Sequence, residues 1–271
     1  MSPTLWSAIV ERTAKALASG ALVPIHTEVE HVEDGGVRFL VRVVSSLERK
    51  ARAAKPPSDG GPPKNPFLPP YEEELYVGPL PPAHECLLNK FNVFEHHALI
   101  VTRDFEPQDS LLTPADFEAL LAGMASFDAL AFYNGGRLAG ASQPHKHLQL
   151  VPVPLASGAH RTPMDEAIAQ RRLPFRHALG PPPLEPTQAH ATYMDLLGQV
   201  GCERPGQPYN LLATRDWMLV VPRSQECFES TSLNAIAFAG SLLVKNREQL
   251  ELVRAVGPMA MLCAVSASKT A

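Results

Sequence analysis

The sequence predicts an α+β fold with a largely antiparallel sheet. Strand-like runs mostly follow one another directly, as at 84–91 and 97–102 and again at 209–214 and 217–222. Helical patterns stand between these pairs and do not alternate with single strands, as they would in a doubly wound fold. At 271 residues, 45% hydrophobic and 19% charged, the chain has the composition of a globular protein with a sizeable core.

Helix signals and one long loop organise the N-terminal region. Pro3 and Gly20 suit the start and the stop of a helix over 3–19. The run "VRFLVRVV" at 37–44 predicts a strand, and the proline- and glycine-rich segment 48–70 predicts a loop.

The middle of the chain predicts a helix followed by two strands. Thr113 and Pro114 can cap and open a helix, because apolar residues then recur at helical spacing. The strands are expected at 129–134 and 145–153, joined by a glycine-rich loop. The C-terminal region predicts helices at 187–198 and 246–256, the second ended by Gly257, with a strand at 239–245 between them.

Charge and composition exclude several classes. The formal net charge of −4 gives no global reason to expect nucleic-acid or membrane partners. No apolar run approaches the ~20 residues of a membrane helix, and the N-terminus lacks a signal-peptide pattern. The four cysteines contain no CxxC pair, so a cytoplasmic location is expected.

A polar pattern, "HKHLQ", occupies the strand at 145–153. Residues two apart share one face of a strand, so His145, His147 and Gln149 are expected to point one way. Lys146 would point the opposite way, where we expect it to be solvated. Taken alone, the pattern also fits a polar strand face with satisfied hydrogen bonds.

The loop before this strand favours phosphate binding. It contains small residues and side-chain donors, and glycine lets backbone N–H groups approach an anion; the residues concerned are Gly140, Ala141, Ser142 and Gln143. Together with a nearby imidazole, this loop makes phosphoryl chemistry the better interpretation. Two histidines could also hold zinc, but no nearby carboxylate or cysteine completes the ligands, so no protein metal site is predicted.

The segment "YNGGRLAGASQPHKHLQLVPVP" resembles the active-site segment of the diadenosine tetraphosphate phosphorylases, or ATP adenylyltransferases, of the histidine-triad superfamily. The resemblance continues in "LLNKFNVFEHHALIVTRDFEPQDSLLTPADF" and "YNLLATRDWMLVVPRS". It implies a histidine-triad-like antiparallel sheet with flanking helices and N- and C-terminal elaborations. The chain would then be a single catalytic unit over 1–271. Residues 1–155 would carry the motif, and residues 186–271 would complete the nucleotide site.

The resemblance implies that His147 attacks the α-phosphorus of an adenine nucleotide and forms a covalent AMP adduct, with His145 assisting. Diadenosine tetraphosphate and phosphate would give ADP and ATP. Gln149 stands where histidine-triad hydrolases carry a third histidine, and an amide cannot act as an acid or base near neutral pH. We therefore expect it to bias the adduct toward phosphorolysis.

The resemblance also implies further substrate contacts, namely Lys50, Leu88, Asn89, Asn210, Thr214, Arg223 and Lys245. Asn134 stands where the chain enters the phosphate loop, so it is expected either to hold a phosphate or ribose oxygen or to cap the turn. His97 is expected to be structural. Mg²⁺ is expected to arrive with the nucleotide. The expected partners are a dinucleoside polyphosphate, ATP, ADP and phosphate.

Two alternatives remain open from the sequence. A hexose-1-phosphate uridylyltransferase shares two histidines and a glutamine, although that family usually has proline where Lys146 stands. A catalytically silent module that only binds adenine nucleotides is the other.

Overall fold

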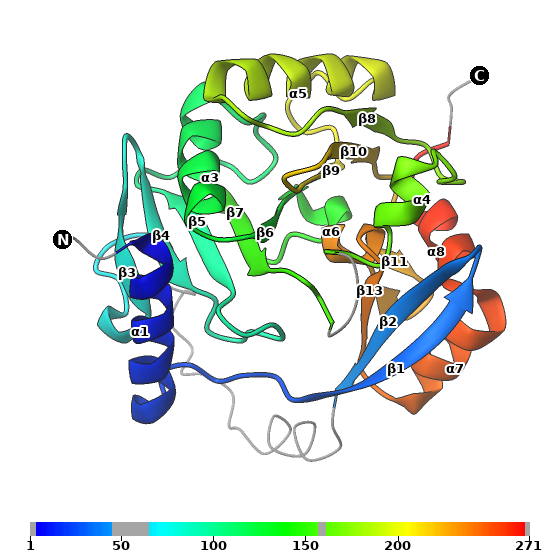
Figure 1. The fold of residues 1–271 in the computed structure, drawn as a ribbon, viewed down its shortest axis with the longest axis horizontal. Coiled ribbons are helices and arrows are strands. Elements are labelled where there is room, and N and C mark those ends of the chain that lie inside the picture. Colours follow the sequence, from blue (N-terminus) through cyan, green and yellow to red (C-terminus); the bar gives the residue numbers. More distant parts are fainter. Residues whose placement is uncertain (1–3, 45–64, 157–160, 269–271) are drawn as a thin grey trace.

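The computed structural model describes residues 4–44, 65–156 and 161–268. Its main feature is an eight-stranded sheet in which every neighbouring pair is antiparallel. In spatial order (Figure 1) the strands are β3 (Tyr76–Leu80), β4 (His84–Leu88), β5 (Ala98–Thr102), β7 (His147–Pro152), β6 (Ala129–Gly135), β9 (Tyr209–Ala213), β10 (Met218–Pro222) and β8 (Ala178–Gly180). The predicted α+β class with a largely antiparallel sheet is confirmed.

Three helices cover one face of this sheet: α1 (Leu5–Ser19), α3 (Pro114–Ser126) and α5 (Pro186–Val200). Their apolar side chains pack on alternate residues of the strands, including Ile100, Leu148 and Leu150. Helix α3 begins at a complete capping box between Thr113 and Asp116. The predicted helices at 3–19 and 187–198 and the helix predicted to open at Pro114 are confirmed within a few residues.

A second, three-stranded sheet covers part of the opposite face. It contains β1 (Thr27–Asp34), β2 (Val37–Val44) and β13 (Ser241–Val244), and β13 is parallel to β2. Four helices complete this side: α4 (Asp165–Ala169), α6 (Ala235–Phe238), α7 (Arg247–Val256) and α8 (Pro258–Val265). The small sheet and the 65–76 segment cover different halves of the main sheet on this face.

Sequence patterns missed β1, β3 and α8. Strand β1 is largely polar and partly exposed, but Gly35 and Gly36 join it to β2 in a two-residue hairpin loop, which is a signal that could have found it. Helix α8 begins with Pro258 immediately after α7 ends, so the predicted stop is also a start. Within the described residues, no helix is long and apolar enough to cross a membrane.

Candidate active site

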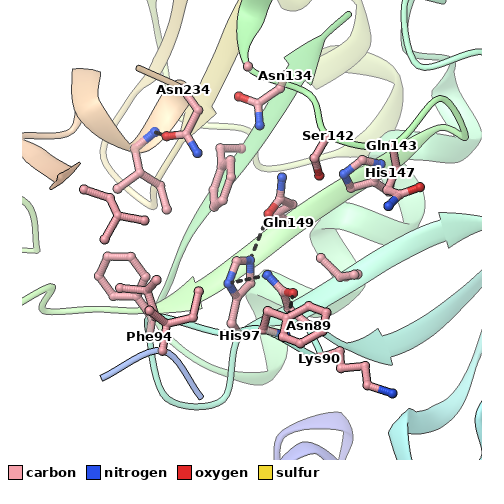
Figure 2. Close-up of a pocket in the computed structure, with 18 of the residues that line it drawn as sticks. Asn89, Lys90, Phe94, His97, Asn134, Ser142, Gln143, His147, Gln149 and Asn234 are labelled. Atoms are coloured by element: carbon pink, nitrogen blue, oxygen red, sulfur yellow. Dashed lines mark hydrogen bonds between the residues drawn. The ribbon is translucent and has the colours of Figure 1, made fainter. Parts of the chain in front are cut away.

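A cavity of about 730 Å³ opens on the face of the main sheet opposite α1, α3 and α5. Its floor is a cross-strand row, Leu87–Leu99–Gln149–Phe132, whose members are direct partners on β4, β5, β7 and β6. Gln149 is therefore a single amide in an otherwise apolar row. His147 lies two residues before it on β7 and lines the same cavity (Figure 2).

His147 has one committed ring nitrogen and one free one. Its Nδ1 lies 2.8 Å from the carbonyl oxygen of His145, which requires the proton to be on Nδ1. No described residue hydrogen-bonds to Nε2. Burial lowers the pKa of His147 to about 4, so the ring is neutral near pH 7. A neutral imidazole with a bare Nε2 facing a cavity can act as a nucleophile.

His97 fixes the orientation of the Gln149 amide. The Nε2 of His97 lies 2.9 Å from Gln149 Oε1, and its Nδ1 lies 3.2 Å from Asn89 Nδ2 (Figure 2). Because Nδ1 accepts from the amide of Asn89, Nε2 carries the proton and donates it to Gln149 Oε1. Gln149 therefore has its NH₂ group left for a ligand. Burial also lowers the pKa of His97 to about 4.

His97 was predicted to be structural; the structure places it beside Gln149 in the cavity lining, where both of its ring nitrogens bond to protein side chains. One sequence signal is consistent with this placement. His97 shares a strand face with Leu99, and Leu99 is the direct partner of Gln149. That pairing becomes visible only once the register of β5 and β7 is known.

Asn134 presents a second oriented amide. Its Oδ1 accepts hydrogen bonds from Asn210 Nδ2 at 2.9 Å and from the backbone N–H of Ala235 at 3.0 Å. Its own NH₂ group is therefore the free end, and the residue lines the cavity. Asn210 does not line the cavity itself and acts through Asn134.

Arg223 lies beneath this amide pair. The guanidinium is buried and donates to Asn210 Oδ1 at 2.6 Å and to five backbone carbonyls, among them those of Ala139 and Leu233. Burial lowers its pKa to about 10. The predicted substrate contact is not supported, because every nitrogen is already bonded to protein.

The glycine-rich loop supplies donors at the same end. Gly140 has φ +92°, and a Cβ there would lie 2.7 Å from the Cβ of Asn234, so only glycine allows this approach. Ser142 and Gln143 line the cavity, and no described residue bonds their backbone N–H groups or side chains. Ala141 is not among the lining residues; its N–H donates to the carbonyl of Gly136. The loop can therefore hold an anion through free N–H groups.

The other end of the cavity is mainly apolar. It is lined by side chains from the N-terminal and C-terminal regions of the chain, including Leu88, Phe94, Ile236 and Leu242. Asn89 and Lys245, both predicted contacts, lie along this wall. Asn234, which sequence reasoning missed, caps α6 and faces the cavity (Figure 2).

Two further predicted residues, Thr214 and His145, lie away from the cavity lining. Thr214 follows β9 at the end remote from Asn134, and its hydroxyl accepts from the N–H of Asp216; it does not line the cavity. His145 bridges Thr102 and Asn65 through its ring nitrogens, and it supports His147 through its carbonyl instead of facing the cavity. Lys50 lies outside the described residues.

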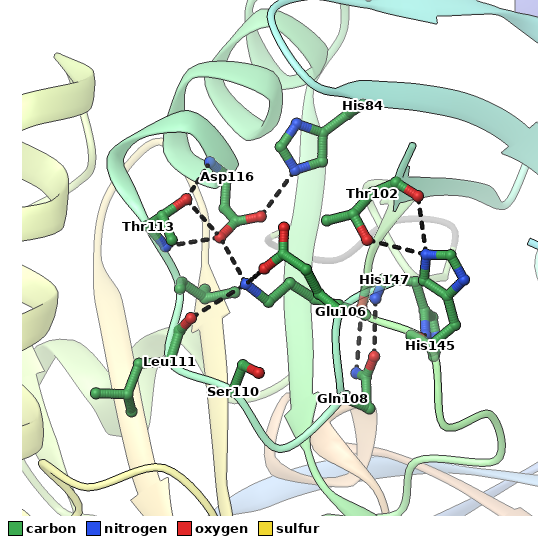
Figure 3. Close-up of polar contacts among 12 residues, drawn as sticks. His84, Thr102, Glu106, Gln108, Ser110, Leu111, Thr113, Asp116, His145 and His147 are labelled. Carbon is green, nitrogen blue, oxygen red and sulfur yellow. Dashed lines mark hydrogen bonds and ion pairs between the residues drawn. The ribbon is translucent and has the colours of Figure 1, made fainter. Parts of the chain in front are cut away.

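Lys146 corrects another prediction. It points away from His147 as expected, but its side chain is fully buried instead of solvated. Its Nζ lies 2.6 Å from Glu106 Oε2 and 3.2 Å from Asp116 Oδ2 (Figure 3). Asp116 also accepts from His84 Nε2 at 2.7 Å. Although burial opposes ionisation, His84 and Lys146 hold the pKa of Asp116 below its usual value.

Metal ligands are sparse among the described residues. They contain no group of three histidine, cysteine or acidic side chains that could hold a metal ion. Glu72 is the one carboxylate among the described residues that line the cavity, and both its oxygens lie 2.8 Å from Lys90 Nζ.

Two family models together match almost the whole chain. Residues 1–170 match the Ap4A phosphorylase N-terminal domain, and residues 171–268 match the ATP adenylyltransferase C-terminal domain. The chain belongs to the Ap4A phosphorylase family. The resemblance inferred from the histidine segment is thereby confirmed.

Relatives in the Ap4A phosphorylase family are similar over most of their length. Protein APA1 and diadenosine 5',5'''-P1,P4-tetraphosphate phosphorylase 2, both of Saccharomyces cerevisiae, are 28% and 29% identical; the alignments cover 89% and 90% of this chain and 87% and 88% of theirs. The crystal structure of yeast Apa2 with AMP matches with a TM-score of 0.81 and 26% identity, covering both chains completely. The complex of Apa2 with Ap4A matches with a TM-score of 0.79 and 26% identity over 98% of each chain.

Proposed function

We propose that this protein cleaves diadenosine tetraphosphate by phosphorolysis through a covalent AMP adduct on His147. The observation that carries the proposal is the state of the His147 ring, with Nδ1–H held by a carbonyl and Nε2 open to the cavity. Family membership adds support, since the similar yeast enzyme is a diadenosine tetraphosphate phosphorylase and Apa2 has been crystallised with Ap4A and with AMP.

The chemistry balances in two displacements. His147 Nε2 forms a bond to the phosphorus nearest one adenosine, while the bond from that phosphorus to the bridging oxygen breaks and ATP leaves with the electron pair. A phosphate oxygen then attacks the same phosphorus and displaces Nε2, which gives ADP and restores the neutral ring. The adduct carries a positive imidazole, and the carbonyl of His145 stabilises the N–H that it keeps.

Gln149 suits this reaction because it supplies a hydrogen-bond donor without a transferable proton. Its Oε1 is occupied by His97, so its NH₂ can contact a phosphate oxygen. ATP leaves through a phosphate oxygen that is already a weak base, and inorganic phosphate attacks without the activation that water needs. An acid at position 149 is therefore unnecessary.

The cavity accommodates the rest of the nucleotide in two zones. The α-phosphate would meet Ser142, Gln143 and Asn134 beside His147, and the adenine would occupy the apolar end near Phe94 and Ile236. Lys90 and Lys245 are the lysines among the described residues that line the cavity, and they would contact the further phosphates. Mg²⁺ would arrive with the polyphosphate, and chelation should slow the reaction without changing the melting temperature of the free protein. The proposed location is the cytoplasm.

Isotope labelling tests the proposal. Diadenosine tetraphosphate with labelled α-phosphorus, added without phosphate, should leave labelled AMP on the protein. Addition of phosphate should then release labelled ADP. The His147→Ala variant should bind AMP but never become labelled, whereas His31→Ala, which removes an exposed histidine on β1, should label as the wild type does. A binding module would bind dinucleotide with no label in any variant, and that result would exclude catalysis.

A further inference from the structure

We propose that Gln108 is a positioning residue that holds the strand of His147 apart from β6 and sets the placement of His147 relative to Asn134. The inference rests on the proposed role of His147 as nucleophile. It assigns a task to a buried side chain that neither lines the cavity nor belongs to the histidine motif.

The main sheet has a gap at the site. The ladder between β6 and β7 ends at the pair Phe132–Gln149. Two residues further along each strand, Asn134 pairs only with Asn210 on β9, and His147 pairs only with Val101 on β5. Each strand keeps its partner on the far side, β9 for β6 and β5 for β7, but β6 and β7 no longer pair with each other. The cavity floor ends at this divergence, with Asn134 on one side and His147 on the other.

The amide of Gln108 fills this gap. Its Oε1 accepts from the backbone N–H of His147 at 2.8 Å, and its Nε2 donates to the carbonyl of His147 at 3.2 Å (Figure 3). The same Nε2 donates to the carbonyl of Asn134 at 2.9 Å. A side-chain amide thus replaces the peptide group that β6 would have supplied. Without it, the buried N–H and carbonyl of His147 would lose this partner, which is costly in the interior of a protein, and the carbonyl of Asn134 would keep only the N–H of Gly136.

The backbone of Gln108 is itself fixed. Its N–H donates to the carbonyl of Pro144 at 2.9 Å, and its carbonyl accepts from Tyr133 Oη at 2.5 Å. Two residues earlier, the carboxylate of Glu106 pairs with Lys146 Nζ, and the Glu106 carbonyl accepts from the Lys146 N–H at 2.7 Å. The segment is therefore tied to β6 and β7 on both sides of the gap, and the amide cannot follow a shift of either strand freely.

This arrangement acts on the reacting geometry. The nucleophile belongs to β7 and the oriented amide of Asn134 belongs to β6, so their relative position depends on what joins the strands at this level. A displacement of about 1 Å at a reacting group can cost about 100-fold in rate. Loss of the Gln108 amide should therefore lower the rate of adduct formation more than it lowers affinity for AMP.

The test compares Gln108→Met with Gln207→Met. Gln207 is the control, because its amide likewise bonds only to backbone, accepting one N–H and donating to one carbonyl, but it is half-buried and remote from the cavity. Single-turnover labelling should show adduct formation about 100-fold slower in Gln108→Met. The dissociation constant of AMP should change by about threefold or less, because the pocket walls remain. Gln207→Met should match the wild type in both. Equal rates in the two variants would overturn the proposal, as would a loss confined to AMP affinity.

The Gln108→Glu variant tests the same point if Gln108→Met does not fold. Ionised, the carboxylate faces two carbonyl oxygens and repels them; protonated, it restores one donor and one acceptor. Burial raises a carboxyl pKa from about 4.3. The other titratable groups at this place are His147, Tyr133 and the Glu106–Lys146 pair, and all of them are also present in the wild type. The activity of the variant relative to wild type should rise severalfold from about pH 8 to about pH 6, and an unchanged ratio would overturn the proposal.

The two proposals fail in different ways. If the wild type is never labelled, or if His147→Ala is still labelled, the nucleophile assignment is wrong whatever Gln108 does. If labelling depends on His147 and Gln108→Met labels at the wild-type rate, only the positioning role is wrong.

Discussion

Lys146, directly before β7, and His147, the first residue of β7, point to opposite faces of the main sheet and differ in how fully their hydrogen-bonding groups are used. Both side chains are buried, polar and adjacent in sequence. Lys146 meets two carboxylates and a backbone carbonyl, so all three of its donors are used. His147 is neutral and keeps one nitrogen without a described partner. Burial alone does not mark the reactive group; unused hydrogen-bonding capacity facing a cavity does.

Among the changes considered, removal of the Lys146 ammonium should have the largest effect on stability. Lys146→Met leaves the buried carboxylate of Asp116 without the Lys146 ammonium, and removal of one partner from a buried ion pair costs about 3–5 kcal/mol. Urea denaturation should show this loss, whereas Lys15→Met, which removes an exposed pair with Glu11, should stay within error of the wild type. Equal stability of the two variants would mean that the buried cluster contributes nothing.

The neutral state of the His147 ring should be visible in the pH dependence of the free energy of unfolding. Because the pKa of His147 is lowered to about 4, the unfolded chain binds more protons than the folded one between about pH 6.5 and pH 4. Stability is therefore complete above the unfolded pKa and is lost as pH falls. In His147→Asn, the loss between about pH 7 and pH 5 should be smaller by about 2 kcal/mol, measured by denaturant titration. An identical loss in the variant would contradict a neutral ring.

A smaller effect should follow from freeing the Gln149 amide. His97→Phe keeps an aromatic ring but removes the donor to Gln149 Oε1, so the amide can rotate away from the phosphate. Loss of one such orienting hydrogen bond, about 1.4 kcal/mol, should slow adduct formation about tenfold. Single-turnover labelling measures it, and a wild-type rate would show that Gln149 is held by other contacts.

The smallest expected effect is a change in product ratio. Gln149→His places a group that can accept and donate a proton beside the adduct, so attack by water should gain relative to attack by phosphate. The ratio of AMP to ADP formed at fixed phosphate should rise severalfold. A ratio equal to that of the wild type would remove the argument that the glutamine favours phosphorolysis.

The sequence by itself determined what depends on near neighbours. Periodicity and caps located α1, α3, α5 and most of the strands, and alternation placed His147 and Gln149 on one face. The glycine-rich loop was recognisable from its composition, because a positive φ such as that of Gly140 favours glycine locally. The resemblance to a known family gave the expected reaction. Three of the expected contacts, Asn89, Asn134 and Lys245, line the cavity.

Tertiary structure alone decided which distant side chains meet. The bond from His97 to Gln149 depends on the register of β5 against β7, and the place of Gln108 depends on where β6 and β7 diverge. Lys146 is buried because carboxylates from two other segments reach it. Thr214 fits a family position but lies at the wrong end of its strand. The hydrogen bonds of His97, Gln108 and Lys146 join residues 26 to 52 positions apart, and no local pattern encodes strand register across such separations.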